Sequence, residues 1–246
     1  MIFNYDGLKI YYITKGKGNE DCPLIFLHGW EGSSLSFKYF FEKMCEKRFC
    51  INLDFPPFGN SSMPEKPLKV EDYADIIIKL LKSLKVEKVD IVAHSFGGRV
   101  AIYLASQTPL VNKMLLTGCA GLKKRSFLKW FKIKKFKFLS FLARRGLYDI
   151  DKLKSFGSEE YKKLNPVMKQ TFTNIVNYDQ KKQLCKIKCP TLLVWGSLDK
   201  ETPFYFTKIF KNNIKECEVI KFEKSGHFAY LENVKLFLYI LLSFFC

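Results

Sequence analysis

Short apolar runs alternate along the chain with longer segments of helical periodicity. The runs are mainly continuous in their hydrophobicity, without the alternation of a half-exposed strand. Strands that are apolar on both faces belong to a parallel sheet covered by helices on both sides. The predicted strands are Ile10 to Ile13, Leu24 to Leu27, Cys50 to Leu53, Val89 to Ala93, Lys113 to Thr117, Thr191 to Trp195 and Glu218 to Phe222.

Three segments carry helical periodicity: 72–84, 97–106 and 232–245. In the first of them the apolar residues recur every three or four positions, which is typical of a helix with one buried face. The chain has 246 residues, including 24 Phe and 12 Tyr, which is enough apolar material for a large core. We therefore expect an α/β fold with a mostly parallel central sheet and helices on both faces.

The alternation breaks between Gly121 and Lys188, where no strand-like run of comparable length occurs. This interruption predicts a helical lid, residues 121–188, inserted into a core formed by residues 1–120 and 189–246. An insertion between strands of such a sheet usually lies over the ligand crevice at their carboxyl ends.

The chain is strongly basic, with 41 Lys and Arg, 24 Asp and Glu, and a formal net charge of +17. Its densest basic stretch lies in the predicted lid, interleaved with aromatic residues. One interpretation is a lid helix with an aromatic stripe over the pocket; the other is a basic face that docks an acidic carrier protein or an anionic membrane. Without a nucleic-acid-binding motif, no nucleic-acid partner is predicted. The stretch comprises Lys123, Lys124, Arg125, Lys129, Lys132, Lys134, Lys135, Lys137, Arg144 and Arg145.

The eight cysteines are spread along the chain without a CxxC pair, which predicts reduced thiols and neither a disulfide scaffold nor a zinc site. The amino-terminal residues lack the basic and apolar regions of a signal peptide. The longest apolar run, Leu236 to Cys246, is about half the roughly 20 residues needed to span a bilayer. We therefore expect a cytoplasmic protein whose carboxyl-terminal helix is buried.

The segment Ala93-His94-Ser95-Phe96-Gly97 stands where a predicted strand meets a predicted helix. This is the Gly-x-Ser-x-Gly pattern of a nucleophile elbow, with Ala93 in place of the first glycine. The serine occupies a strained turn, and small neighbours two positions away let strand and helix approach each other closely. The turn would also place the Phe96 N–H at a helix N-terminus, where a developing oxyanion is stabilised.

Three further motifs supply the groups that a nucleophilic serine requires. The turn His28-Gly29-Trp30 would bring the Trp30 N–H to the nucleophile as a second oxyanion donor. Asp199 and His227 each follow a predicted strand, which gives the chain order Ser, Asp, His. His227 is predicted to take the Ser95 proton while Asp199 orients it, and Glu201 is the alternative acid. No metal or other cofactor is expected.

The remaining two histidines, His28 and His94, lie inside glycine-containing turns. We expect them to bond backbone atoms and hold those turns, and we keep them as candidate substrate-binding residues. Arg99 lies about one helical turn beyond Ser95, so it could reach an anionic substrate. The alternative for Arg99 is a solvated or ion-paired helix residue.

Together these motifs resemble the α/β-hydrolase superfamily from end to end. The segment Asp54 to Ser61 is similar to the family's Asp-x-Pro-Gly-x-Gly-x-Ser turn, with Pro57 where glycine is usual. The His-Gly-Trp turn is similar to that of the pimeloyl-acyl carrier protein methyl ester esterases. The segment Ser95 to Arg99 is similar to the elbow of the menaquinone-pathway SHCHC synthases, in which the matching arginine contacts a substrate carboxylate.

The resemblance implies a serine hydrolase that cleaves a carboxylic ester or thioester, free or on an acyl carrier protein, through an acyl-enzyme on Ser95. Two alternatives stay open. One is a lyase or carbon–carbon bond hydrolase that uses the same triad on an anionic substrate bound by Arg99. The other is a non-catalytic binding protein on the same fold. Dehalogenases and epoxide hydrolases of this fold use Asp as nucleophile, so neither reaction is expected.

Overall fold

The computed structural model describes residues 1–17, 22–123, 139, 141, 143, 145 and 159–246. Most of the basic stretch of the predicted lid lies outside the described residues, and the partner predictions that rest on it stay predictions. The basic residues outside are Lys124, Arg125, Lys129, Lys132, Lys134, Lys135, Lys137 and Arg144.

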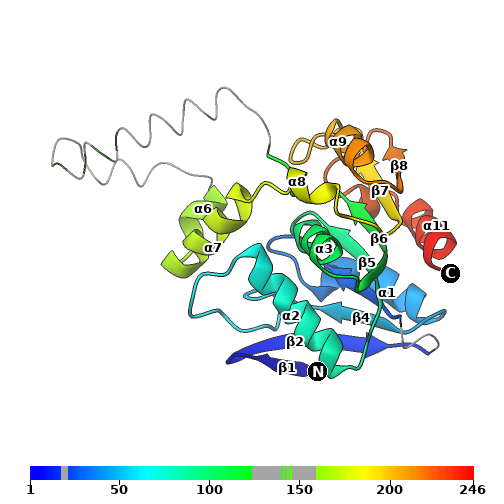
Figure 1. Cartoon of the computed structure of the whole chain (residues 1–246), viewed down its shortest axis with the longest axis horizontal. Helices are drawn as coiled ribbons and strands as arrows, with labels where there is room; N and C mark the ends of the chain where they lie inside the picture. The colour runs from blue at the N-terminus through cyan, green and yellow to red at the C-terminus, as the bar shows by residue number, and fades with distance from the viewer. Residues whose placement is uncertain (18–21, 124–138, 140, 142, 144, 146–158) are drawn as a thin grey trace.

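A sheet of eight strands in the order β1-β2-β4-β3-β5-β6-β7-β8 runs through the molecule (Figure 1). The pairs from β4 to β8 are parallel, whereas β2 is antiparallel to both of its neighbours. The predicted mostly parallel sheet and its seven predicted strands are confirmed. The strands are β1 (Ile2–Tyr5), β2 (Leu8–Lys15), β3 (Leu24–Leu27), β4 (Cys50–Leu53), β5 (Val89–His94), β6 (Val111–Thr117), β7 (Thr191–Gly196) and β8 (Cys217–Phe222).

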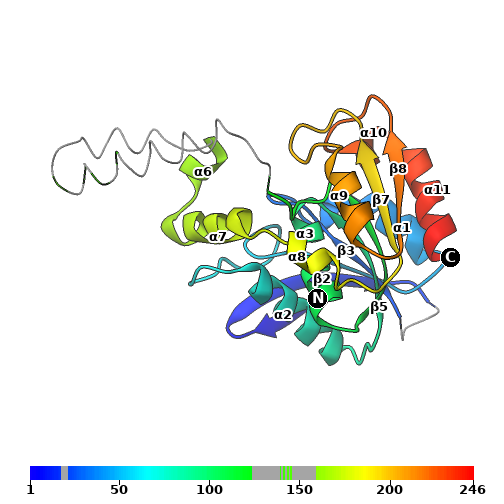
Figure 2. The same cartoon turned by 45° about the horizontal axis from the view of Figure 1, so that its top comes forward.

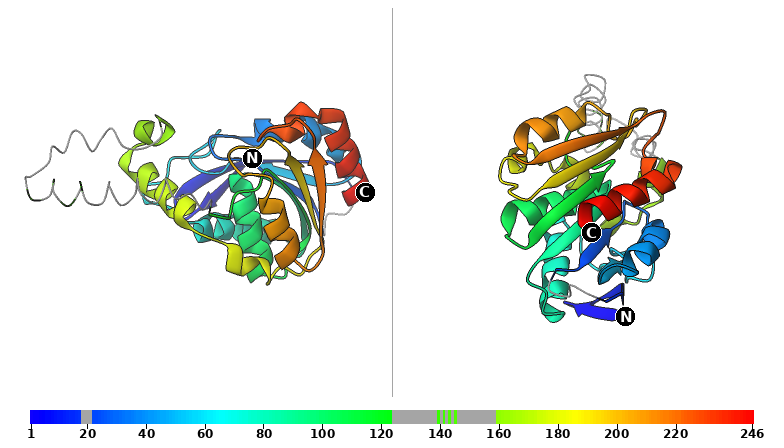
Figure 3. Two further views of the ribbon diagram at one scale, coloured as in Figure 1. Left: turned by 90° about the horizontal axis from the view of Figure 1, so that it is seen from above. Right: turned by 90° about the vertical axis from the view of Figure 1, so that its right-hand side faces the viewer.

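Helices cover both faces of the sheet: α2, α3, α8 and α9 lie on one face, and α1 and α11 on the other (Figure 3). The predicted helices 72–84, 97–106 and 232–245 correspond to α2, α3 and the α10–α11 pair. The described helices are α1 (Lys38–Cys45), α2 (Val70–Ser83), α3 (Phe96–Gln107), α6 (Glu159–Lys163), α7 (Pro166–Asn177), α8 (Lys181–Leu184), α9 (Phe206–Asn213), α10 (Ala229–Glu232) and α11 (Val234–Phe245), with the 3-10 helix η1 (Ser34–Phe37) before α1.

Each central strand contributes side chains to two separate apolar cores. In β3, Ile25 and Leu27 join the core under α2 and α3, while Leu24 and Phe26 join the core under α1 and α11. Successive side chains of a strand point to opposite faces of the sheet, so a strand covered on both faces must be apolar throughout. This is why the strand signal in the sequence is continuous.

Between β6 and β7, the described residues form helices α6, α7 and α8 and no strand. Figure 2 shows α6 and α7 beside the sheet, outside the layers that cover its faces. Helix α8 packs against α3. The boundary between core and lid stays a prediction.

The carboxyl-terminal helix α11 buries Phe237 and Leu241 and exposes Leu236 and Tyr239, so it is half-buried. In the described part of the chain, no helix has both the length and the hydrophobicity to cross a bilayer.

A buried ion pair ties together the amino-terminal ends of three strands. Arg48 precedes β4 and donates from Nη1 to Asp90 Oδ2 of β5 at 2.8 Å and to the Phe245 carbonyl of α11 at 3.0 Å. Asn112 of β6 donates to the other Asp90 oxygen at 2.8 Å. Both charged side chains are almost completely buried. Removing one partner would leave the other charge buried and uncompensated, which is far more costly than losing an exposed pair.

We predict that Asp90→Ala lowers the free energy of unfolding by about 3–5 kcal/mol, because the Arg48 guanidinium loses its buried counter-ion. Urea unfolding followed by circular dichroism measures this change. Lys43→Ala is the control, because it breaks the exposed pair with Glu46, which has the same 2.8 Å separation. That substitution should leave the stability within experimental error. Equal losses in the two variants would contradict the role given to the buried pair.

Candidate active site

Ser95 forms the turn between β5 and α3 in a left-handed backbone conformation. Its φ is 48° and its ψ is −108°, a combination rarely adopted by residues with a side chain. The turn is held by hydrogen bonds from the Ser95 N–H to the Thr117 carbonyl at 3.1 Å and from the Ala120 N–H to the Ser95 carbonyl at 3.0 Å. A Cβ atom at Gly97 would overlap the Leu27 carbonyl, so glycine is required for strand and helix to approach this closely.

The imidazole of His227 is hydrogen-bonded to both Ser95 and Asp199, the two partners that the sequence motifs predict for it. Its Nε2 lies 3.0 Å from Ser95 Oγ, and its Nδ1 lies 2.8 Å from Asp199 Oδ2. The three side chains follow β5, β7 and β8, whose carboxyl ends meet at one edge of the sheet. This is the arrangement in which a histidine can accept the serine proton while a carboxylate fixes its tautomer.

Asp199, and not Glu201, is the acid that contacts His227. Its Oδ1 accepts the Glu201 and Thr202 backbone N–H groups at 2.9 Å each, and its Oδ2 accepts the Thr202 hydroxyl at 2.8 Å. Burial alone would raise the pKa of Asp199, but the His227 imidazole and these donors outweigh it and hold the pKa below its ordinary value. The carboxylate is therefore fixed in its charged form, while the side chain of Glu201 stands in solvent.

Thr202 is a site residue that the sequence reasoning missed. Its hydroxyl holds the same Asp199 oxygen that bonds His227, and its carbonyl accepts the Trp195 indole N–H at 2.7 Å. A threonine three residues after an acid can donate its side-chain hydroxyl and its backbone N–H to the same carboxylate. The spacing of Asp199 and Thr202 in the sequence could therefore have indicated this role.

His28 bonds backbone on both sides of its ring. Its Nδ1 lies 2.7 Å from the Gly29 carbonyl, and its Nε2 accepts the Phe55 N–H at 2.8 Å. Burial lowers the pKa of His28 to about 4, in keeping with a neutral ring. His28 thus links the turn that contains Trp30 with the segment that follows β4. Neither of its ring nitrogens is free for a substrate.

His94 is buried beneath His227. Its Nε2 donates to the His227 carbonyl at 3.1 Å, and the centroids of the two imidazole rings are 4.8 Å apart. Burial, together with the neighbouring His227, lowers the pKa of His94 to about 3. The His94 ring supports the backbone of His227 and also contacts the rings of Phe228 and Tyr230.

The two residues whose amides are expected to form an oxyanion hole, Trp30 and Phe96, contact each other through their side chains. Phe96 is the first residue of α3, and its ring meets the Trp30 ring edge-on at 5.6 Å. In the described part of the chain, no hydrogen bond uses either backbone N–H. Unused donors beside a nucleophilic serine are available to a substrate oxygen.

The Trp30 side chain lies at the centre of an aromatic group, with Phe58 at 4.9 Å and Phe172 of α7 at 5.3 Å. Its indole Nε1 is buried and has no hydrogen-bond partner among the described residues. The Phe172 contact brings the region between β6 and β7 against the turn that carries Trp30.

Arg99 is buried at 7% exposure and is neither solvated nor paired with an acid in the described structure. Its Nη1 donates to the Tyr178 carbonyl at 2.7 Å, and its own carbonyl accepts from the Gln180 side chain at 2.8 Å. Burial lowers the pKa of Arg99 to about 10, a value at which it remains charged. The residue ties α3 to the segment between α7 and α8.

No group of three or more His, Cys, Asp and Glu side chains with the arrangement of a metal site occurs within the described ranges.

Residues 23–158 match a family model described as the alpha/beta hydrolase fold. Among curated proteins, the chain is 27% identical to the AB hydrolase superfamily protein YisY of Bacillus subtilis, covering 86% of this chain and 87% of YisY. It is 24% identical to a proline iminopeptidase of Lactobacillus crispatus, covering 92% of this chain and 91% of that protein. Among solved structures, the esterase EaEST of Exiguobacterium antarcticum superposes with a TM-score of 0.76 at 23% identity, covering 97% and 96% of the two chains.

The buried His94 predicts how stability depends on pH. An imidazole in the unfolded chain titrates near pH 6.5, whereas His94 in the folded chain stays neutral down to about pH 3. Between these values the unfolded state binds a proton that the folded state does not bind, so acid favours unfolding. The contribution is fully present above pH 6.5 and is lost as the pH falls, with a limiting slope of about 1.4 kcal/mol per pH unit.

Urea unfolding of the wild type and His94→Asn at several pH values between about 7 and 5 measures this contribution. The wild type should lose stability more steeply on acidification, with a difference in slope approaching about 1.4 kcal/mol per unit below pH 6. Titrating groups that do not contact His94 are shared by the two proteins and cancel in the difference. Parallel pH profiles would show that His94 titrates normally in the folded protein.

Proposed function

The chain belongs to the α/β-hydrolase fold family, and from this premise we propose that it is a serine hydrolase that cleaves carboxylic esters or thioesters. The observation that carries the proposal is the position of His227, bonded at once to Ser95 Oγ at 3.0 Å and to Asp199 at 2.8 Å. A serine hydroxyl becomes nucleophilic when an oriented base accepts its proton as it attacks.

In the first half of the reaction, Ser95 Oγ attacks the substrate carbonyl and His227 Nε2 takes the hydroxyl proton. The carbonyl oxygen becomes negatively charged and is bound by the Phe96 and Trp30 N–H groups. Collapse of this intermediate expels the alcohol or thiol, which receives the proton from His227. The acyl group is then covalently attached to Ser95.

In the second half, His227 removes a proton from a water molecule that attacks the acyl-enzyme. The bond to Ser95 then breaks, His227 returns the proton to Ser95 Oγ, and the acid is released. Asp199 stabilises the imidazolium in both halves and itself remains charged. Throughout, the lowered pKa of Asp199 keeps the carboxylate ionised.

The aromatic side chains around the oxyanion turn support a substrate with a mainly apolar acyl group. Trp30, Phe58 and Phe172 are half-buried, and the Trp30 ring contacts Phe58, Phe172 and Phe96, the residue that follows the nucleophile. Small-molecule sites are lined mostly by apolar and aromatic groups with few polar ones.

The alternative of a lyase or carbon–carbon bond hydrolase gains no support from the placement of Arg99. That reaction needs the guanidinium for an anionic substrate, whereas Arg99 is buried and donates to the Tyr178 carbonyl. The same triad serves both reactions, so the alternative is kept as an outcome of the experiment below.

A fluorophosphonate probe tests the proposal together with a panel of p-nitrophenyl esters of increasing acyl length. We expect the wild type to be labelled and to hydrolyse esters, and Ser95→Ala to lose both, with kcat reduced by roughly 10⁵–10⁶-fold. Ser106→Ala is the matched control, because Ser106 lies on the same helix and, among the described residues, its hydroxyl bonds only the nearby Tyr103 carbonyl at 3.0 Å and the exposed Gln107 side chain at 3.1 Å.

Labelling that persists in Ser95→Ala would contradict the assignment of the nucleophile. Ser95-dependent labelling without turnover of any carboxylic ester would favour the lyase or carbon–carbon hydrolase.

A further inference from the structure

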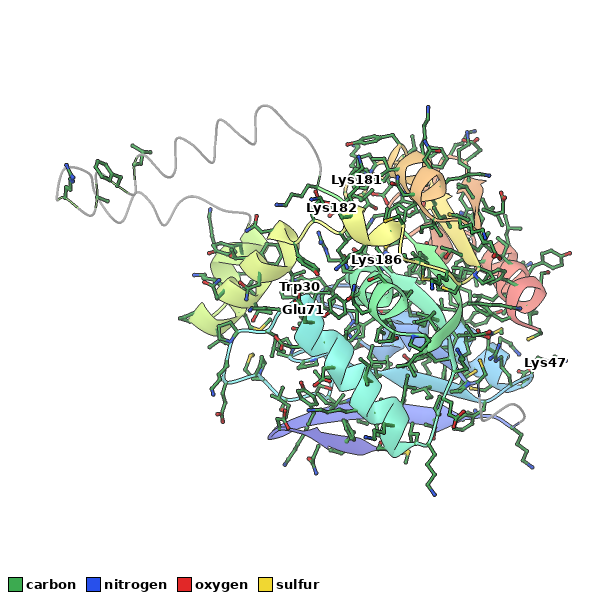
Figure 4. The ribbon with its side chains drawn as sticks, viewed as in Figure 1. Trp30, Lys47, Glu71, Lys181, Lys182 and Lys186 are labelled. Atoms are coloured by element: carbon green, nitrogen blue, oxygen red, sulfur yellow. The ribbon has the colours of Figure 1, made fainter. Side chains whose placement is uncertain are left out.

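A polar cavity of about 490 Å³ lies at the amino-terminal edge of the sheet, away from the triad. Lys47 and Arg48 line it from the approach to β4, Lys88 and Asp90 from the start of β5, and Lys113 from β6. The catalytic residues follow the carboxyl ends of β5, β7 and β8, so the sheet separates the two places. Figure 4 shows Lys47 at the right-hand edge of the molecule, well away from the active-site residue Trp30.

Positive charge dominates the lining of this cavity. Four side chains are cationic and one, Asp90, is a carboxylate. Both Asp90 oxygens are occupied, one by Arg48 and one by Asn112, at 2.8 Å each. No free carboxylate side chain is left to attract a cation, and even a carboxyl group at Cys246 would leave an excess of positive charge.

The lysines of the lining retain N–H donors for a ligand. Lys47 is exposed, and its ammonium has no ion pair or hydrogen bond with any described residue. Lys88 donates one hydrogen bond to the Pro109 carbonyl at 2.6 Å, and Lys113 donates one to the Phe244 carbonyl at 3.3 Å. An ammonium has three N–H groups, so these lysines each keep unused donors.

Arg48 supplies a fixed cation at the base of the cavity. Its side chain is held by Asp90, by the Phe245 carbonyl at 3.0 Å and by the Cys22 carbonyl at 2.5 Å. Its Nε is buried and finds no partner among the described residues. A cation immobilised in this way binds an anion without losing the side-chain entropy that a free arginine would lose.

From this charge, size and fixed geometry we propose that the cavity binds a small phosphate-bearing organic anion. Arginine and lysine are the side chains that recognise phosphate, through charge-assisted hydrogen bonds. The volume lies within the range of about 300–1,000 Å³ found for small-molecule sites and exceeds the needs of a bare phosphate. Lys47, Lys113 and Arg48 would surround the phosphate, and the carbon part would lie toward Phe245, the aromatic residue of the lining.

Isothermal titration calorimetry with phenyl phosphate and with inorganic phosphate tests this site, at an ionic strength held constant with sodium chloride. We expect saturable binding at one site, with phenyl phosphate bound more tightly than inorganic phosphate. Lys47→Gln should weaken both anions, and the double variant Lys47→Gln/Lys113→Gln should weaken them by roughly tenfold or more. Ser95→Ala should bind as the wild type does, because the site does not involve the triad.

A chain with a net charge of +17 binds anions non-specifically, so a charge-matched control is needed. Lys186→Gln removes an exposed lysine near α8, outside the cavity lining, where Figure 4 labels it. We expect it to leave both affinities unchanged.

Absence of saturable binding, or an equal loss of affinity in Lys186→Gln and Lys47→Gln, would overturn the proposal. Lys47 is exposed, so the single variant decides the matter even if the double variant fails to fold.

Discussion

The left-handed backbone at Ser95 is the constraint on which the site depends. Such a conformation costs on the order of 1–3 kcal/mol for a residue with a side chain, so the surrounding structure must impose it. The Ser95 N–H donates to the Thr117 carbonyl at the end of β6, and the Ser95 carbonyl accepts from the Ala120 N–H in the loop after β6. On the β3 side, Gly97 lies directly against the Leu27 carbonyl. The same turn leaves Ser95 half-exposed and makes Phe96 the first residue of α3, so the proposed nucleophile and the proposed oxyanion donor are positioned together.

The other parts of the site are held by buried groups with no chemical role of their own. His28 fixes the turn that carries Trp30, and His94 supports the backbone of His227. Burial keeps both rings neutral, and a neutral ring bonds backbone without bringing an uncompensated charge beside the triad. Thr202 completes this set, because it holds the Asp199 oxygen that bonds the catalytic histidine.

The sequence predicted the sheet and the triad motifs because their signals are local. Strands apolar on both faces and an elbow of small residues around Ser95 can be identified within a few positions. It favoured Asp199 and left Glu201 as the alternative acid, because the two share a loop and only the fold decides which carboxylate faces the backbone N–H groups and His227. Nor could it place Arg99, whose partner Tyr178 lies 79 residues away. The strand Ile2–Tyr5 was missed because it is short and half-exposed, although an Asp-Gly turn follows it.

Comparing Asp199→Asn with Glu201→Gln tests the proposed Ser95–His227–Asp199 triad most directly. The measurement is kcat/KM for the ester that the wild type hydrolyses best. Both substitutions neutralise a carboxylate in the same loop, but only the Asp199 carboxylate contacts His227. We predict that Asp199→Asn lowers kcat/KM by roughly 10³–10⁴-fold, while Glu201→Gln stays within about twofold of the wild type. A large loss of kcat/KM in Glu201→Gln, with near-normal kcat/KM in Asp199→Asn, would contradict the assignment of Asp199 as the acid of the triad.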